Sequence, residues 1–132
     1  MSREVRWQCA ERGCFRDALM PRLGAFDGCF PRGIGMTDLD GFVEVGGHFI
    51  LLEWKAPGGT LTLGQRLAFE RLTKACPVVT VLVVSGEPAE PSVTSLQRIK
   101  GGVVEPVMAC DTARFHRSLA AWARQADLRS IA

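Results

Sequence analysis

The segment that decides the fold is Asp38-Leu-Asp-Gly-Phe-Val-Glu-Val-Gly-Gly-His-Phe-Ile-Leu-Leu-Glu-Trp-Lys55. Two stretches typical of β-strands, residues 39–45 and 48–55, flank the pair Gly46-Gly47, which favours a tight two-residue hairpin turn. A turn of this length fixes the register in which the two strands pair. The segment therefore predicts a β-hairpin whose cross-strand partners can be counted outward from the glycines.

This register gathers four charged residues at the far end of the hairpin. Asp40 falls opposite Glu53 and Asp38 falls opposite Lys55, and residues two apart along a strand share a face. Directly opposed β-carbons lie about 4.5–5.5 Å apart, where like charges destabilise the pair. Two opposed acids beside a lysine indicate a site that holds a cation.

The remainder of the hairpin is largely apolar on both faces, so we expect most of it to be covered on both sides. An unpaired charge at the end of such a strand would be costly. A structural Glu53–Lys55 ion pair would account for two of the charges, but it leaves the two aspartates unexplained.

The segments that follow predict an α/β domain. Thr62 and Gln65 fit a capping box that opens a helix over residues 63–75, whose apolar stripe is Leu63, Leu67, Ala68, Leu72 and Ala75. The β-branched run at 78–84 is typical of a buried central strand, and the strand–helix–strand order predicts that it lies parallel to strand 48–55.

The ends of the chain complete the predicted fold. Residues 4–20 have the apolar spacing of a helix, residues 93–99 and 103–108 predict two short strands, and Asp111 caps a helix over 112–126. We expect a mixed central sheet flanked by three helices, in a single domain spanning residues 1–132.

Composition excludes several classes of protein. With 47% hydrophobic and 23% charged residues and a net charge of +2, the chain resembles an ordinary globular protein, and the charge alone does not predict a nucleic-acid partner. No apolar run has the length of a membrane span, and the first residues lack a secretory h-region. We therefore expect a cytoplasmic protein with no membrane partner, whose five cysteines are free thiols.

The acid cluster supports two kinds of chemistry. Opposed carboxylates can share a proton, as in glycosidases, or bind a divalent cation. The chain has no tyrosine, whereas glycosidase clefts are usually lined with aromatic residues. Mg²⁺ binds few protein oxygens and takes up phosphate oxygens, and a neighbouring lysine can assist an attacking water. The cluster therefore favours phosphodiester hydrolysis.

The spacing of Asp40, twelve intervening residues and Glu53-Trp54-Lys55 resembles the signature of the PD-(D/E)xK, restriction-endonuclease-like nuclease superfamily. Gly64-Gln65 on a helix and the strand at 78–84 resemble its small stand-alone members of the VRR-NUC or Holliday-junction-resolvase-like type, from phages or bacteria. The resemblance covers roughly residues 36–85. The proline that names the motif is absent, and two aspartates stand in this region.

The resemblance implies a restriction-endonuclease-like core and roles for individual residues. Asp40 and Glu53 would hold Mg²⁺, for which Mn²⁺ would substitute, with the backbone carbonyl of Trp54. Lys55 would be the catalytic lysine, and Gln65 would match a glutamine that some members place beside the site. From spacing alone, the capping role of Gln65 is about as well supported.

Asp38 is the alternative metal ligand to Asp40. Glu11 would match an acid on the first helix of some members, and from its position alone it could equally face solvent. Arg32 and Arg66 are candidate DNA contacts, and the alternative for Arg32 is a surface arginine on a loop. The implied substrate is duplex or branched DNA in a bacterial or phage-infected cell, cut by a possible homodimer. The alternative is a catalytically inactive module of the same fold that binds DNA or a host protein.

Overall fold

The computed structural model describes residues 21–131. The chain divides after Asp38 into two compact units, and each is described by itself. The N-terminal unit contains two short 3-10 helices, η1 (Leu23–Phe26) and η2 (Pro31–Gly33). The predicted helix over residues 4–20 lies outside the described residues. None of the helices in the described part of the chain is both long and apolar enough to cross a membrane.

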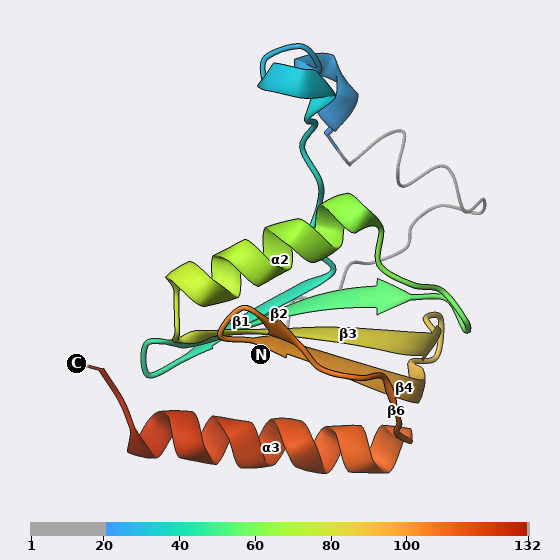
Figure 1. The fold of residues 1–132 in the computed structure, drawn as a ribbon. Coiled ribbons are helices and arrows are strands. Elements are labelled where there is room, and N and C mark those ends of the chain that lie inside the picture. The colour runs from blue at the N-terminus through green and yellow to red at the C-terminus, as the bar shows by residue number, and fades with distance from the viewer. Residues whose placement is uncertain (1–20, 132) are drawn as a thin grey trace. The chain divides into compact units, whose positions relative to one another are not determined.

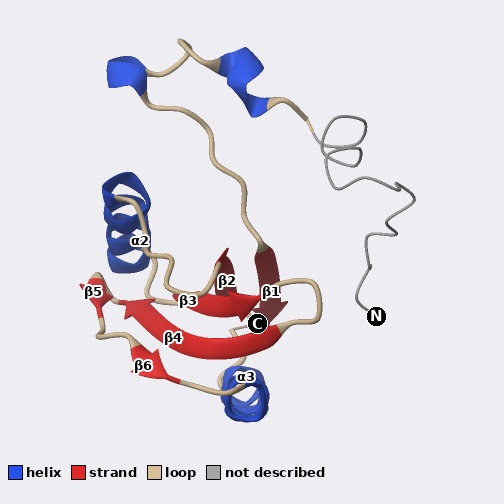
Figure 2. Cartoon of the chain, turned by 90° about the vertical axis from the view of Figure 1, so that its right-hand side faces the viewer, coloured by secondary structure: helices blue, strands red, loops and turns tan. Residues whose placement is uncertain are grey.

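The second unit is a six-stranded mixed sheet between two helices (Figures 1 and 2). The strand order is β1-β2-β3-β4-β5, and β6 pairs with β4. This arrangement confirms an α/β fold with a mixed sheet and the helices expected at 63–75 and 112–126. The elements are β1 (Gly41–Val45), β2 (His48–Lys55), α2 (Leu63–Ala75), β3 (Val79–Glu87), β4 (Ser92–Lys100), β5 (Val103–Val104), β6 (Met108–Ala109) and α3 (Thr112–Leu128).

The β1–β2 hairpin has the predicted register. All five ladder pairs, from Val45–His48 to Gly41–Leu52, agree with counting outward from the turn. Gly46 and Gly47 have φ values of 57° and 83°, the left-handed conformation that a type I′ turn requires at both central positions. The ladder ends at Gly41, however, so the two outer pairs of charged residues do not form as backbone pairs.

The central strand β3 lies parallel to β2, as predicted, with α2 between them in the chain. Glu53 pairs with Val83 and Lys55 pairs with Ser85 in this ladder. Residues 80–86 of β3 are all buried, and β3 continues three residues beyond the expected end at 84. Glu53 and Lys55 of the predicted motif therefore lie next to the central strand of the sheet.

The predicted strand over residues 103–108 is wrong as a single element. It is split into β5 and β6, which both pair with β4. Pro106 lies between them, and proline has no N–H to donate to a ladder. The side-chain amide of Gln97 instead donates to the Glu105 carbonyl at 3.0 Å, which bridges the interruption.

Each face of the sheet has its own core. On one face, α3 packs its predicted stripe, which includes Phe115, Leu119 and Trp122, against β2, β3 and β4. On the other face, α2 covers a cluster that includes Leu51, Val81 and Val83. Figure 2 shows the two helices on opposite sides of the sheet.

Two expectations about burial are wrong. On α2 the buried residues are Phe69 and Thr73, whereas Leu63 is 73% exposed. The helix presents a face that follows i, i+4 spacing from Gln65 through Phe69 to Thr73, so polar residues share the buried stripe. On β1, Phe42 and Val43 are exposed, because α2 and α3 pack over β2, β3 and β4 and neither core includes a residue of the edge strand β1.

Candidate active site

The acid and the lysine of the motif lie on the α2 face of β2. Strand alternation puts Glu53 and Lys55 on the same face as the buried Leu51. The Lys55 Nζ lies 3.3 Å from Glu53 Oε1, and the two side chains are 18% and 10% exposed. The structure therefore holds a charged pair close to a hydrophobic cluster, where removal of either partner would leave a poorly solvated charge.

Gln65 connects the two charges from the first turn of α2. Its Nε2 donates to Glu53 Oε1 at 3.0 Å, and its Oε1 accepts from Lys55 Nζ at 2.9 Å. The amide thus presents its donor to the carboxylate and its acceptor to the ammonium group, as each charge requires. The three side chains form a closed set of contacts between β2 and α2.

The same glutamine also completes the capping box of α2. The Thr62 Oγ1 accepts from the Gln65 backbone N–H at 3.2 Å, and Gln65 Oε1 accepts from the Thr62 N–H at 3.2 Å. The capping role predicted for Gln65 is therefore confirmed, whereas its role at the site stays a prediction. The cap fixes the position of Gln65 at the start of the helix, and the side chain extends from there to the charged pair.

Asp40 lies just before β1 and next to the motif. Its Oδ2 accepts a hydrogen bond of 2.7 Å from the backbone N–H of Trp54, the residue between Glu53 and Lys55. This contact takes the place of the predicted backbone pair between Asp40 and Glu53. The carboxylate is thereby held against β2 at the position of the motif, although the ladder itself has ended.

Each carboxylate retains one oxygen without a protein partner among residues 21–131. No hydrogen bond from a described residue engages Glu53 Oε2 or Asp40 Oδ1. Asp40 is an exposed residue, whereas the Glu53 side chain is only 10% exposed. A cation could approach these two oxygens without breaking the contacts that Glu53 makes to Lys55 and Gln65.

Two serines that the sequence reasoning missed lie beside the lysine. Ser85 pairs with Lys55 and Ser95 pairs with Ser85 across neighbouring strands, so all three side chains share a face. The two serine hydroxyls are hydrogen-bonded to each other. With Thr60 and Gln97 they line a hollow of about 40 Å³. The signal that could have found them is the pairing of β2 with β3, because the parallel register places Ser85 beside Lys55.

The remaining predicted residues are not assembled into this geometry. Arg66 on α2 is exposed, and its Nε contacts Glu70 Oε1 at 3.0 Å. Arg32 and Asp38 belong to the N-terminal unit, and Glu11 lies outside the described residues. Their predicted roles, including that of Asp38 as the alternative ligand, remain predictions.

Across residues 21–131, no three His, Cys, Asp or Glu side chains are grouped so as to hold a metal ion. The predicted site differs from such a group because it uses two carboxylates and one backbone carbonyl. Comparisons of the chain with protein-family models, with curated protein sequences and with solved structures found no significant match. The functional argument therefore depends on the geometry of the residues themselves.

Proposed function

We propose that this protein is a Mg²⁺-dependent endodeoxyribonuclease of the PD-(D/E)xK type. The observation that carries the proposal is the set of contacts around Glu53, in which Lys55 and Gln65 hold one carboxylate oxygen and leave the other free. A second carboxylate, that of Asp40, is fixed at the adjacent backbone N–H. These are the acids and the lysine that the motif requires, gathered at one end of β2.

The order of the elements is consistent with a restriction-endonuclease-like core. An antiparallel hairpin leads into α2, and the chain then returns as β3 parallel to β2. The motif lies at the C-terminal end of β2, and the first turn of α2 supplies Gln65. In open α/β sheets, ligands commonly bind beyond the carboxyl ends of the strands, which is where the charged residues of this chain lie.

The donor set fits a hard divalent cation. Mg²⁺ prefers oxygen ligands and is often bound by only one or two carboxylates, with waters and substrate phosphates completing its shell. Glu53 and Asp40 would hold it through their free oxygens, with the Trp54 carbonyl as the third protein ligand. When bound, such a metal lowers the pKa of a coordinated water and offsets charge on the phosphoryl group.

Lys55 would act on the attacking water or on the phosphoryl oxygen. An ammonium group has three N–H donors, of which one is directed to Gln65 and one faces Glu53. The third remains for a water or a phosphate oxygen. Because Gln65 and Glu53 fix the direction of the amine, Lys55 would not need to reorient as negative charge develops.

A purely structural ion pair explains less of the arrangement. Buried charged pairs often contribute little net stability, since the cost of desolvation can exceed the attraction. A pair kept only for stability would need neither a Glu53 oxygen left without a partner among the described residues nor a second carboxylate from Asp40. The nuclease proposal gives both features a use.

DNA is the proposed substrate, and a homodimer that cuts both strands is part of the same proposal. Thr60, Ser85 and Ser95 line the hollow beside Lys55, and hydroxyl groups are common partners of phosphate oxygens. This supports a phosphate contact at the end of β3 that lies beside Lys55.

A cleavage panel tests the proposal. Plasmid, linear duplex, branched and single-stranded DNA would be incubated with the purified full chain in Mg²⁺, in Mn²⁺ and in EDTA. We expect cleavage of at least one substrate with either metal and none in EDTA. If every DNA stays intact but gel-shift experiments show metal-independent DNA binding, the inactive module is the correct alternative and the nuclease proposal is wrong.

A further inference from the structure

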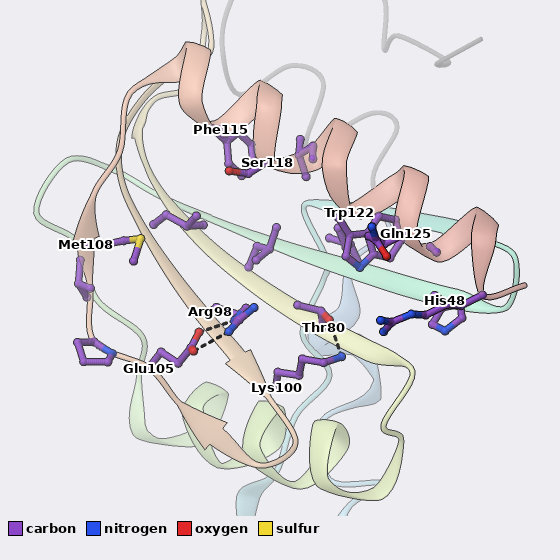
Figure 3. A pocket seen from close by; sticks show the side chains of 18 residues that line it. His48, Thr80, Arg98, Lys100, Glu105, Met108, Phe115, Ser118, Trp122 and Gln125 are labelled. Atoms are coloured by element: carbon purple, nitrogen blue, oxygen red, sulfur yellow. Dashed lines mark hydrogen bonds and ion pairs between the residues drawn. The ribbon is translucent and has the colours of Figure 1, made fainter.

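A large cavity of the second unit lies on the face of the sheet opposite the candidate active site (Figure 3). It has a volume of about 620 Å³ and lies between α3 and strands β2, β3 and β4. Pockets that bind small molecules usually measure about 300–1,000 Å³. The charged trio of the proposed nuclease does not contribute to its lining.

Much of the lining is apolar. Leu82 and Leu96 on the sheet, Phe115 and Leu119 on α3, and Met108 on β6 all contribute to it. In Figure 3, Phe115 and Met108 lie away from His48, which marks one end of the cavity. An apolar chain or ring placed here would exchange water for hydrocarbon and aromatic contacts.

The His48 end of the cavity carries polar and cationic groups. His48 is the first residue of β2, Thr80 is the second of β3 and Lys100 is the last of β4. Because β4 runs antiparallel to the other two strands, all three residues lie at the same end of the strands. Arg129 caps the C-terminal end of α3, close to where the Ile131 N–H donates to the Gly46 carbonyl of the hairpin turn. These residues bring two cations and an imidazole to one end of an otherwise apolar space.

These cations are not offset within the described part of the chain. Arg98, which also lines the cavity, is bound in a bidentate pair to Glu105. Lys100 makes only 3.3 Å hydrogen bonds to the Pro77 carbonyl and the Thr80 hydroxyl, and neither it nor Arg129 forms an ion pair with a described carboxylate. The cavity therefore favours an anion.

His48 also lines the cavity at its cationic end. Its Nδ1 is buried and has no hydrogen-bond partner among the described residues, whereas buried polar atoms are nearly always satisfied. Because this nitrogen has no surface open to the cavity, a ligand headgroup would pair with it only after the imidazole ring rotates.

We propose that this cavity binds a small amphipathic carboxylate, with its apolar body under α3 and its carboxylate at Lys100, Arg129 and His48. The bottom of the cavity is formed by core residues such as Ile50, which is 3% exposed. A small ligand can reach these residues, whereas the flat surface of a partner protein would contact only the residues at the opening. An acyl chain of about ten carbons suits a cavity of this size.

Titration of the full chain with decanoate, followed by calorimetry and by intrinsic tryptophan fluorescence, tests the assignment, with 1-decanol as the uncharged control. Trp122 lines the cavity, so its contribution to the signal should change on binding. We expect decanoate to bind at least tenfold more tightly than 1-decanol. The double substitution Lys100→Gln/Arg129→Gln should remove this preference. Arg124→Gln removes one charge from the outer, exposed face of the same helix and should change the dissociation constant less than twofold.

Filling the cavity provides the second arm. Ser118→Trp enlarges an exposed residue of α3 that lines the cavity, and it should abolish binding of both probes. Met108→Trp, from β6, repeats the test if the first variant does not fold. Equal affinity for the two probes, no decanoate binding up to millimolar concentration, or binding that persists in a folded cavity-filled variant would overturn the proposal. Self-association through this face would also overturn the proposal. It would appear in sedimentation as a dimer that the Ser118→Trp substitution dissociates, with no binding of decanoate.

Discussion

Gln65 on α2 donates a 3.0 Å hydrogen bond from Nε2 to Oε1 of Glu53 on β2. The contact joins the start of a helix to the end of a strand across a twelve-residue separation. The Gln65 amide oxygen receives Lys55 at the same time. One neutral side chain thus sets the positions of both charges of the motif, and its own backbone is fixed by the Thr62 cap.

The two roles of Gln65 can be separated by substitution. Thr62→Ala removes the cap hydroxyl but keeps the Gln65 side chain, and it should lower the free energy of unfolding by about 1 kcal/mol with cleavage nearly unchanged. Gln65→Leu removes the contacts to Glu53 and Lys55, and we expect the cleavage rate to fall roughly 10–100-fold, because the catalytic groups lose their orientation. Urea unfolding and single-turnover cleavage of both variants give the comparison.

A loss of activity in Thr62→Ala as large as that in Gln65→Leu would assign Gln65 to the helix cap alone. The conservative Gln65→Asn variant provides a further check. Its shorter side chain should not reach the charged pair, so its activity should resemble that of Gln65→Leu.

The Glu53–Lys55 pair should show strong coupling in stability. Lys55→Met leaves the Glu53 carboxylate, which is 10% exposed, beside a hydrophobic cluster. We expect a loss of about 1–3 kcal/mol in unfolding free energy. The double variant Lys55→Met/Glu53→Gln removes both charges and should recover most of that loss, whereas Lys74→Met on the exposed face of α2 should be close to neutral. Additive effects in denaturant unfolding would show that the two side chains do not interact.

Asp40→Asn should separate the fold from the chemistry. The asparagine carbonyl can still accept the Trp54 N–H, so we expect thermal stability to change little, while the loss of a charged ligand should reduce Mg²⁺-dependent cleavage by roughly 100-fold or more. Asp38→Asn is the matched change two residues away. If Asp38→Asn abolishes cleavage and Asp40→Asn does not, Asp38 is the metal ligand and our assignment of Asp40 is wrong.

The pair formed by Arg98 and Glu105 gives an expected pH dependence. The hydrogen bonds from Arg98 lower the pKa of Glu105 below its ordinary value, which is about 4.3. A carboxylate with a lowered pKa in the folded state stabilises the protein above its unfolded-state pKa, and this stabilisation is lost as the pH falls through the folded-state value. Because both side chains are more than a third exposed, we expect only about 0.5–1 kcal/mol.

Urea midpoints measured between pH 7 and pH 2.5 test that expectation. The wild type should lose more stability in the acidic range than Glu105→Gln does. Glu90→Gln, which changes an exposed glutamate in the β3–β4 turn, should follow the wild-type profile. A Glu105→Gln profile parallel to that of the wild type across the whole range would contradict the assignment.

The parts of the fold that could be predicted from the sequence follow short-range rules. The Gly46-Gly47 turn sets the hairpin register, and the Thr62 capping box sets the start of α2 at Leu63, as observed. The buried face of α2 was predicted wrongly because the apolar residues alone were counted. Thr73 is fully buried, since its hydroxyl bonds the Phe69 carbonyl and accepts the Gly102 N–H.

The candidate active site could be predicted from the sequence, whereas the cavity under α3 could not. Glu53, Lys55 and Gln65 lie within thirteen residues, so alternation and a cap suffice to bring them together. The cavity under α3 is lined by residues from His48 to Arg129, and no local pattern links positions so far apart. Only the packing of α3 on the sheet reveals that His48, Lys100 and Arg129 share one space.

The central claim is that Glu53 takes part in Mg²⁺-dependent phosphodiester hydrolysis. The most direct test is the single-turnover cleavage rate of Glu53→Gln on the best DNA substrate, with Glu87→Gln, an exposed glutamate at the end of β3, as the control. The glutamine at position 53 can still accept from Gln65, so the variant should fold, although with a lower unfolding free energy because Lys55 loses its counter-charge. We predict a rate reduced roughly 1,000-fold or more in Glu53→Gln and a rate within twofold of wild type in Glu87→Gln. A folded Glu53→Gln protein that cleaves at the wild-type rate would contradict the claim.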